Sequence, residues 1–141
     1  MFKLNWTKAI IAGIIGTILF DIVGFFFTGQ WWDIPGILGE KTGLGMAYGV
    51  VGHFGNGILL AIIYAALAPH LWGPYWIRPF IFIIAETIAL VWLFMLPLLG
   101  AGVAGLDANP MMPVVTLVRH LVFVIPFIFL INSEYENLQT A

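Results

Sequence analysis

Four long apolar stretches constrain the fold of this chain more than any other feature. They cover residues 9–27, 45–67, 79–99 and 113–131. A helix needs about 20 mostly apolar residues to cross the hydrocarbon core of a bilayer. Only 9% of the residues are charged, whereas a soluble domain carries about 25%. The sequence therefore predicts an all-α fold, in which residues 1–141 form a single transmembrane four-helix bundle of two hairpins.

Proline and tryptophan positions support these boundaries. Pro79 and Pro113 stand at helix starts, where a missing N–H is tolerated, and Pro126 is expected to kink the fourth span. The connection 28–44 carries tryptophans and aliphatic residues among polar ones, so we expect a short helix lying in the membrane interface. An irregular loop is the alternative for this connection.

The distribution of basic residues predicts the orientation. With four spans both termini lie on one side, together with Lys3, Lys8 and Arg78, whereas Lys41 is the basic residue of the connections on the other side. Basic residues are enriched in cytoplasmic segments. We expect an integral protein of a bacterial inner membrane with cytoplasmic N- and C-termini.

Each span carries one ionisable group near its middle, namely Asp21, His53, Glu86 and His120, and Arg119 is a fifth. A charge at the centre of a membrane helix costs about 2.5–3.5 kcal/mol on insertion scales. The whole chain has only five Lys and Arg, seven Asp and Glu and three His residues. Placing so many of them inside apolar spans predicts that they pair or bind a ligand in a buried polar site.

Helical spacing predicts which of these groups meet. Asp21 lies on a stripe of small and polar residues in the first span, and His53 lies on a glycine-rich stripe in the second. Small residues at this spacing let membrane helices approach closely. We therefore expect Asp21 and His53 to face each other, with His120 at a similar depth. Glu86 should lie about 8–10 Å deeper, and Arg119 should pair with Glu86 or Asp21 or face a partner protein.

A haem b is one hypothesis for the polar site. His53 and His120 would be its axial ligands, and Arg119 would meet a propionate. The glycines of the second span would admit the flat macrocycle against the helix backbone; they are Gly49, Gly52 and Gly57. The other explanation for these glycines is close packing of a neighbouring helix.

Two further hypotheses use the same side chains. His53, His120 and Asp21 could bind a metal ion, because imidazole and carboxylate groups are common ligands. A proton or ion relay would use Asp21, Glu86 and Asn56 with the histidines. The structural alternative is that these groups pair within the bundle and only determine its packing. The sequence leaves the cofactor unknown.

The segment between the third and fourth spans resembles an uncharacterised family of small bacterial four-helix membrane proteins. The similar motifs are a Met-x-Pro-x-x-Gly-Ala-Gly turn from Met95, a Pro-Met-x-Pro step from Pro110 and a Thr-Leu-x-x-His helix from Thr116. The pair His53-Phe54 is similar too. The resemblance covers the last three spans, does not extend to Asp21 and Glu86, and implies the four-helix fold and a role for both histidines. It implies no activity.

No catalytic motif is recognisable in the sequence, so we lean against an enzyme. We expect an accessory or structural subunit of a larger membrane complex, or a homo-oligomer. The alternatives are a haem-binding electron carrier and a proton or ion conduit. The predicted partners are the lipid bilayer and other membrane subunits or further copies of the chain. A net charge of −2 gives no reason to expect nucleic acid.

Overall fold

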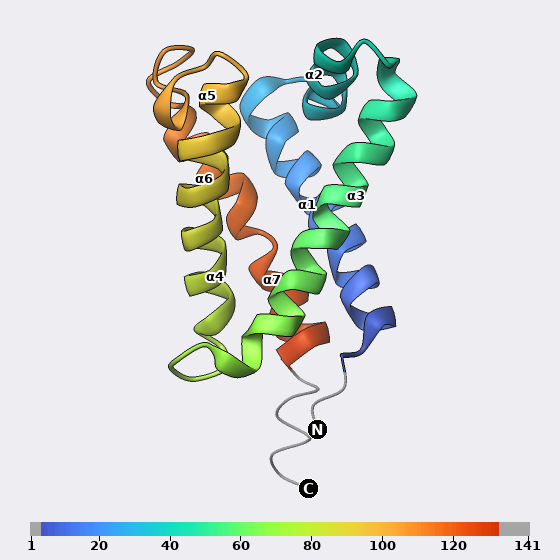
Figure 1. Ribbon diagram of the computed structural model, residues 1–141, viewed down its shortest axis with the longest axis vertical. Helices are drawn as coiled ribbons and strands as arrows, with labels where there is room; N and C mark the ends of the chain where they lie inside the picture. The colour runs from blue at the N-terminus through green and yellow to red at the C-terminus, as the bar shows by residue number, and fades with distance from the viewer. Residues whose placement is uncertain (1–3, 133–141) are drawn as a thin grey trace, which may run out of the picture.

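A computed structural model describes residues Leu4–Asn132, and within this range all regular secondary structure is helical (Figure 1). Lys3 and the acidic tail 133–141 lie outside the described residues. Four helical segments are long and apolar enough to cross a membrane, which confirms the predicted spans. Their bounds are Trp6–Thr28, Gly45–His70, Arg78–Leu98 and Met112–Asn132.

The first span is one α-helix and the second is α-helical up to a final 3-10 turn, whereas the third and fourth contain long π-helical segments. The first span is α1 (Trp6–Thr28), and the second is α3 (Gly45–Leu67) followed by the short helix η1 (Ala68–His70). The third consists of α4 (Arg78–Glu86), the π-helical η2 (Thr87–Met95) and α5 (Leu96–Leu98). The fourth consists of α6 (Met112–Leu121), α7 (Val124–Pro126) and the π-helical η4 (Phe127–Asn132).

The short helix expected in the first connection is present as α2 (Asp33–Thr42). Together with the turn that contains η3 (Val103–Gly105), α2 lies at one end of the molecule, here called the loop end. The described chain starts and stops at the opposite end, here called the terminal end, which also holds η1 (Figure 1).

The fourth span is interrupted just before Pro126, as its sequence predicts. Helix α6 ends at Leu121, and Ile125 N–H bonds to the carbonyl of Val122 in a tighter turn. Proline lacks an N–H and its ring crowds the preceding turn, so an unbroken α-helix cannot pass through this position. The break turns the lower part of the fourth span toward α1.

Helix α1 packs closely against α3 and against the fourth span at two of its glycines. A Cβ at Gly13 would lie 2.5 Å from the Cα of Ile58 in α3, and a Cβ at Gly16 would overlap the ring of Phe123. Close approach of this kind is how membrane helices gain van der Waals contact in a solvent as apolar as themselves. The small-residue stripe predicted on the first span is therefore its buried face.

Aromatic rings close the core at the terminal end. The rings of Tyr64 and Phe127 stack with centroids 4.5 Å apart, and Phe82 packs against both. The Tyr64 hydroxyl donates to Asn132 Oδ1 at 2.6 Å, and the Asn132 amide donates to the carbonyl of Tyr75. These contacts join the second span, the third span and the end of the fourth.

Glycines also hold α2 against α3. A Cβ at Gly49 would lie 1.9 Å from the carbonyl oxygen of Pro35, and a Cβ at Gly39 would lie 2.4 Å from the carbonyl oxygen of Gly45. The obstructing atoms are backbone atoms, which cannot rotate away. Helix α2 is thus fixed to α3 by direct contact of the two backbones.

We expect the Gly49→Ala variant to lose about 1–3 kcal/mol of stability, the usual cost of forcing extra atoms into a packed contact. The physical reason is that the new methyl group must push α2 away from α3. Thermal unfolding of the protein in mild detergent measures the loss as a lower melting temperature.

Gly55→Ala is the matched control, because Gly55 lies on the same helix and a Cβ there meets no atom within 4 Å. Alanine is a better helix former than glycine, so this variant should melt at or above the wild-type temperature. Equal melting temperatures for the two variants would contradict the close packing of α2 on α3.

Candidate functional site

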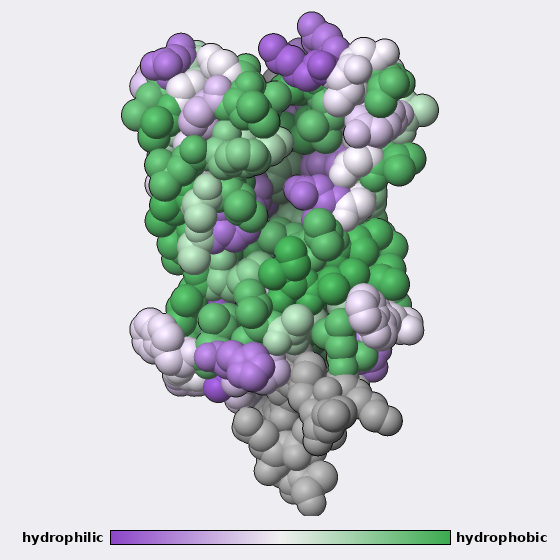
Figure 2. Space-filling view, viewed as in Figure 1, coloured by the Kyte–Doolittle hydropathy of each residue, from purple (hydrophilic) through white to green (hydrophobic). Residues whose placement is uncertain are grey.

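A cavity of about 500 Å³ separates the two hairpins in the half of the molecule next to the loop end. Figure 2 shows it as a hollow that contains hydrophilic side chains, between two columns with largely hydrophobic surfaces. Most of its wall is aliphatic or aromatic. Its polar and charged lining residues are Thr17, Thr28, Asp33, Lys41, His53, Asn56, Asn109, Thr116, Arg119 and His120.

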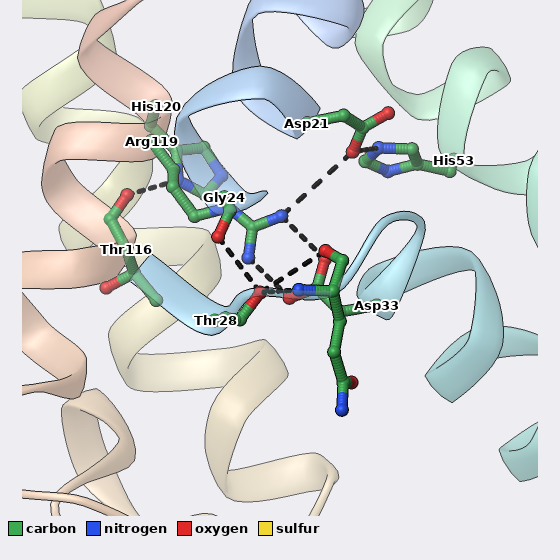
Figure 3. Close-up of polar contacts among 9 residues, drawn as sticks. Asp21, Gly24, Thr28, Asp33, His53, Thr116, Arg119 and His120 are labelled. Atoms are coloured by element: carbon green, nitrogen blue, oxygen red, sulfur yellow. Dashed lines mark hydrogen bonds and ion pairs between the residues drawn. The ribbon is translucent and has the colours of Figure 1, made fainter. Parts of the chain in front are cut away.

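Asp21 and His53 form a buried pair across the first hairpin, as their spacing predicts. The Nε2 atom of His53 lies 2.8 Å from Asp21 Oδ1, and both side chains are almost completely buried (Figure 3). A carboxylate oxygen only accepts, so we place the proton on Nε2. In the neutral tautomer this leaves Nδ1 of His53 as an acceptor.

Arg119 and Asp33 form the second pair, which joins α6 to the start of α2. The guanidinium donates to both oxygens of Asp33, with distances of 2.7 Å from Nη1 and 2.8 Å from Nη2. Its Nη2 also lies 4.0 Å from Asp21 Oδ1. Arg119 is therefore paired with Asp33 and lies near Asp21, while Glu86, the other predicted partner, is not in contact with it. Asp21, Asp33, His53 and Arg119 are here called the charge cluster (Figure 3).

The space for the guanidinium comes from α1. A Cβ at Gly24 would lie 2.3 Å from Nη2 of Arg119, so only glycine leaves room at this position. The Phe20 ring lies beneath the cation, with Cζ 4.2 Å from the ring centroid. This is a cation–π contact, which is strongest when desolvated. The Arg119 Nε is buried and has no hydrogen-bond partner among the described residues.

Two opposing effects act on the Asp33 carboxyl. Burial raises its pKa, but the hydrogen bonds and positive charge of Arg119, helped by the Ile34 N–H, lower it and outweigh burial. The net result is a pKa below the ordinary value of 3.8. Asp33 is ionised at neutral pH and compensates the charge of Arg119.

His120 lines the cavity but belongs to a separate hydrogen-bond network. Its Nδ1 lies 2.7 Å from the carbonyl oxygen of Thr116, and a carbonyl can only accept. In the neutral ring Nε2 is thus an unprotonated acceptor. Thr116 in turn accepts from the indole N–H of Trp92 at 2.9 Å, which ties the third span to the fourth.

Glu86 and Asn56 do not join the charge cluster. Glu86 accepts a hydrogen bond from its neighbour Thr87. Asn56 lines the cavity, and its side chain has no hydrogen bond to a described residue. Among the described residues, no group of three His, Asp or Glu side chains is arranged to hold a metal ion. The proposed metal set of His53, His120 and Asp21 is therefore not assembled in this conformation.

The features expected to admit a haem are occupied by protein. The Phe20 ring contacts both imidazoles, with centroids 5.4 Å from His53 and 5.0 Å from His120. Gly49 packs against Pro35, and a Cβ at Gly57 would overlap the Thr17 hydroxyl. Helix packing, the alternative explanation, accounts for these two glycines. A Cβ at Gly52 meets no atom within 4 Å.

Two charged residues of the candidate site lie outside the predicted set, Asp33 and Lys41. Both are on α2, and both line the cavity. The sequence signal that points to Asp33 is Arg119 in the fourth span, because a buried cation needs a carboxylate partner. This partner need not come from another span. Asp33 lies in a connecting segment, and this is why its role was not predicted. The spacing of residues within a helix does not indicate which residue of a connection contacts a span.

No family model, curated protein or solved structure matches this chain. The site is therefore interpreted from its own geometry. It combines an apolar space with the charge cluster on one wall and His120 beside it. Such an arrangement suits binding of a small molecule that has both an apolar and a polar part.

Asp33→Asn should destabilise the protein at neutral pH by about 3 kcal/mol, because it leaves the buried Arg119 charge without its bidentate partner. The melting temperature in mild detergent measures this loss. Glu40→Gln, an exposed carboxylate on the same helix, is the matched control and should melt as the wild type does.

Acid should remove the difference between the Asp33→Asn variant and the wild type. The pKa of Asp33 is lower in the folded chain, so its stabilising effect is fully present above the ordinary value of 3.8 and is lost as the pH falls through the folded-state pKa. Melting temperatures measured at descending pH should therefore converge below 3.8. A difference that stays constant into this range would refute the ion pair as its source.

Proposed function

We propose that this protein is a non-enzymatic membrane protein that binds a small amphiphilic molecule in the cavity between its hairpins. The observation that supports the proposal is the cavity itself. Its volume of about 500 Å³ lies within the range of about 300–1,000 Å³ that is typical of small-molecule sites. A mainly apolar wall with a few converging polar groups is also characteristic of such sites.

The charge cluster gives the cavity a stable shape. Arg119 of the fourth span holds Asp33 of α2, and α2 is packed directly on α3. The pair therefore links the two hairpins across the loop end of the cavity. A site with a prearranged shape loses less entropy on binding than one that must be ordered by its ligand.

The conduit and haem hypotheses receive less support from this geometry. Between the cavity and the terminal end, the stacked rings of Tyr64 and Phe127 and the tilted ring of Phe82 pack together in the core. A proton or ion path would have to cross this aromatic layer. A bis-histidine haem would have to displace Phe20 from its contacts with His53 and His120.

Filling the cavity should abolish binding. Val115 lines the cavity, so Val115→Phe places a ring inside it. The probe is 1-dodecanol, added to the protein in nanodiscs of zwitterionic lipid. Wild-type protein should show a saturable rise in melting temperature, as expected for a ligand that binds only the folded state. Val115→Phe should reduce the apparent affinity by at least about tenfold.

Val114→Phe is the control, because Val114 is the next residue on α6 and is exposed on the outer surface. It should bind dodecanol as the wild type does. A rise in melting temperature that is the same in both variants would mean that the alcohol acts through the bilayer, and the proposed function would be wrong.

A second candidate function is that of a subunit in a larger membrane assembly or a homo-oligomer. It is favoured by the low burial of the third span. Only 11% of the residues in its apolar window are buried, against 33–39% in the other three spans. Leu93 and Phe94 are among its most exposed side chains. Another membrane protein could cover this face.

Photocrosslinking tests the subunit role. A photoreactive amino acid in place of Leu93 should give a protein adduct in native membranes, because that position lies on the least buried span. The same residue in place of Ile11, which is exposed on α1, serves as the control and should label lipid alone. Lipid adducts from both positions would eliminate the subunit role for this face.

A further inference from the structure

We infer that the ligand of the cavity is a single-chain amphiphile with one negative charge, such as a fatty-acid carboxylate. Its head would lie beside Lys41 at the loop end, and its chain would extend toward Leu60 and Phe123. This inference rests on the proposed function and adds the chemical class of the ligand and its direction in the site.

The charges of the cavity wall favour an anion. Three ionised side chains line the cavity, namely Asp33, Lys41 and Arg119. Asp33 and Arg119 neutralise each other through two hydrogen bonds. Lys41 has no carboxylate within ion-pair distance among the described residues. Lys41 is therefore the charged lining residue without an opposite charge beside it in the described part of the chain, and a ligand with one negative charge would pair with it.

No carboxylate close to the wall pairs with Lys41 in the described part of the chain. Asp21 lies behind the wall, where it is bound to His53 and close to Arg119. Glu40 and Asp107 are exposed near the same end of the molecule, but neither lines the cavity. An anion inside the cavity would therefore meet Lys41 directly and these two carboxylates only through solvent, which screens them.

The shape of the cavity suits one chain lying along the helices. On α1 the wall extends from Thr28 to Thr17, roughly 16 Å by helix rise. Lys41 and Asn109 lie at the loop end, and Leu60 and Phe123 lie at the deep end. A bilayer lipid holds its charged head group at the membrane interface and its chain in the apolar interior. A ligand with its head at the loop end and its chain among apolar residues would place these two parts at similar depths.

The test compares three probes that share one alkyl chain and differ in the head: laurate, 1-dodecanol and dodecylammonium. Each is titrated into the full-length protein in zwitterionic nanodiscs, and binding is followed by the melting temperature. Laurate should bind about three- to tenfold more tightly than dodecanol, the effect of one partly exposed charge pair. Dodecylammonium should bind most weakly.

Lys41→Gln should remove the preference for laurate over dodecanol, because it removes the charge and keeps a side chain of similar length. Lys41→Glu should reverse the preference toward dodecylammonium. Lys8→Gln is the matched control, because it removes a positive charge from the start of α1, far from the loop end. It should retain the wild-type order of affinities for the three probes.

Each other outcome is decisive. Tighter binding of dodecylammonium, or a laurate preference that survives Lys41→Gln, would overturn the assignment of an anionic ligand. Equal binding of the three probes that Val115→Phe abolishes would overturn this inference and leave the proposed function standing. If none of the probes binds saturably, the proposed function fails and this inference fails with it.

Discussion

The rest of the structure depends on the need to compensate one cation, Arg119, inside an apolar bundle. An unpaired charge at this depth would be unfavourable by several kcal/mol. The chain meets this need with Asp33 from outside the spans, Gly24 to make room and Phe20 beneath the guanidinium. These contacts determine where α2 lies, how closely α6 approaches α1 and which side chains face the cavity.

Packing is uneven along the bundle, and this unevenness creates the site. At the terminal end, the rings of Tyr64 and Phe127 stack and join the two hairpins directly. At the loop end, glycines bring α2, α1 and α3 together on one side, while the third span remains largely unburied. The two hairpins lie closer together at the terminal end than at the loop end (Figure 1). Near the loop end the Arg119–Asp33 pair connects them.

The buried polar groups have different roles although the sequence presents them alike. Asp21 and His53 join two neighbouring helices, and Arg119 joins α6 to a connecting segment. His120 is hydrogen-bonded to its own helix and lines the cavity. Glu86 stays apart from them. A shared depth in the membrane is thus not sufficient to form a common site.

The sequence by itself determined the class of fold, the four spans and the pairing of Asp21 with His53, whereas it left the first connection open between a short helix and an irregular loop. All of these follow from apolar length, proline positions and helical spacing, which are local properties. Only the tertiary structure decided that Arg119 pairs with Asp33, 86 positions away in the sequence, and that a cavity separates the hairpins. Such contacts depend on how whole helices tilt and pack, which no periodicity within one helix encodes.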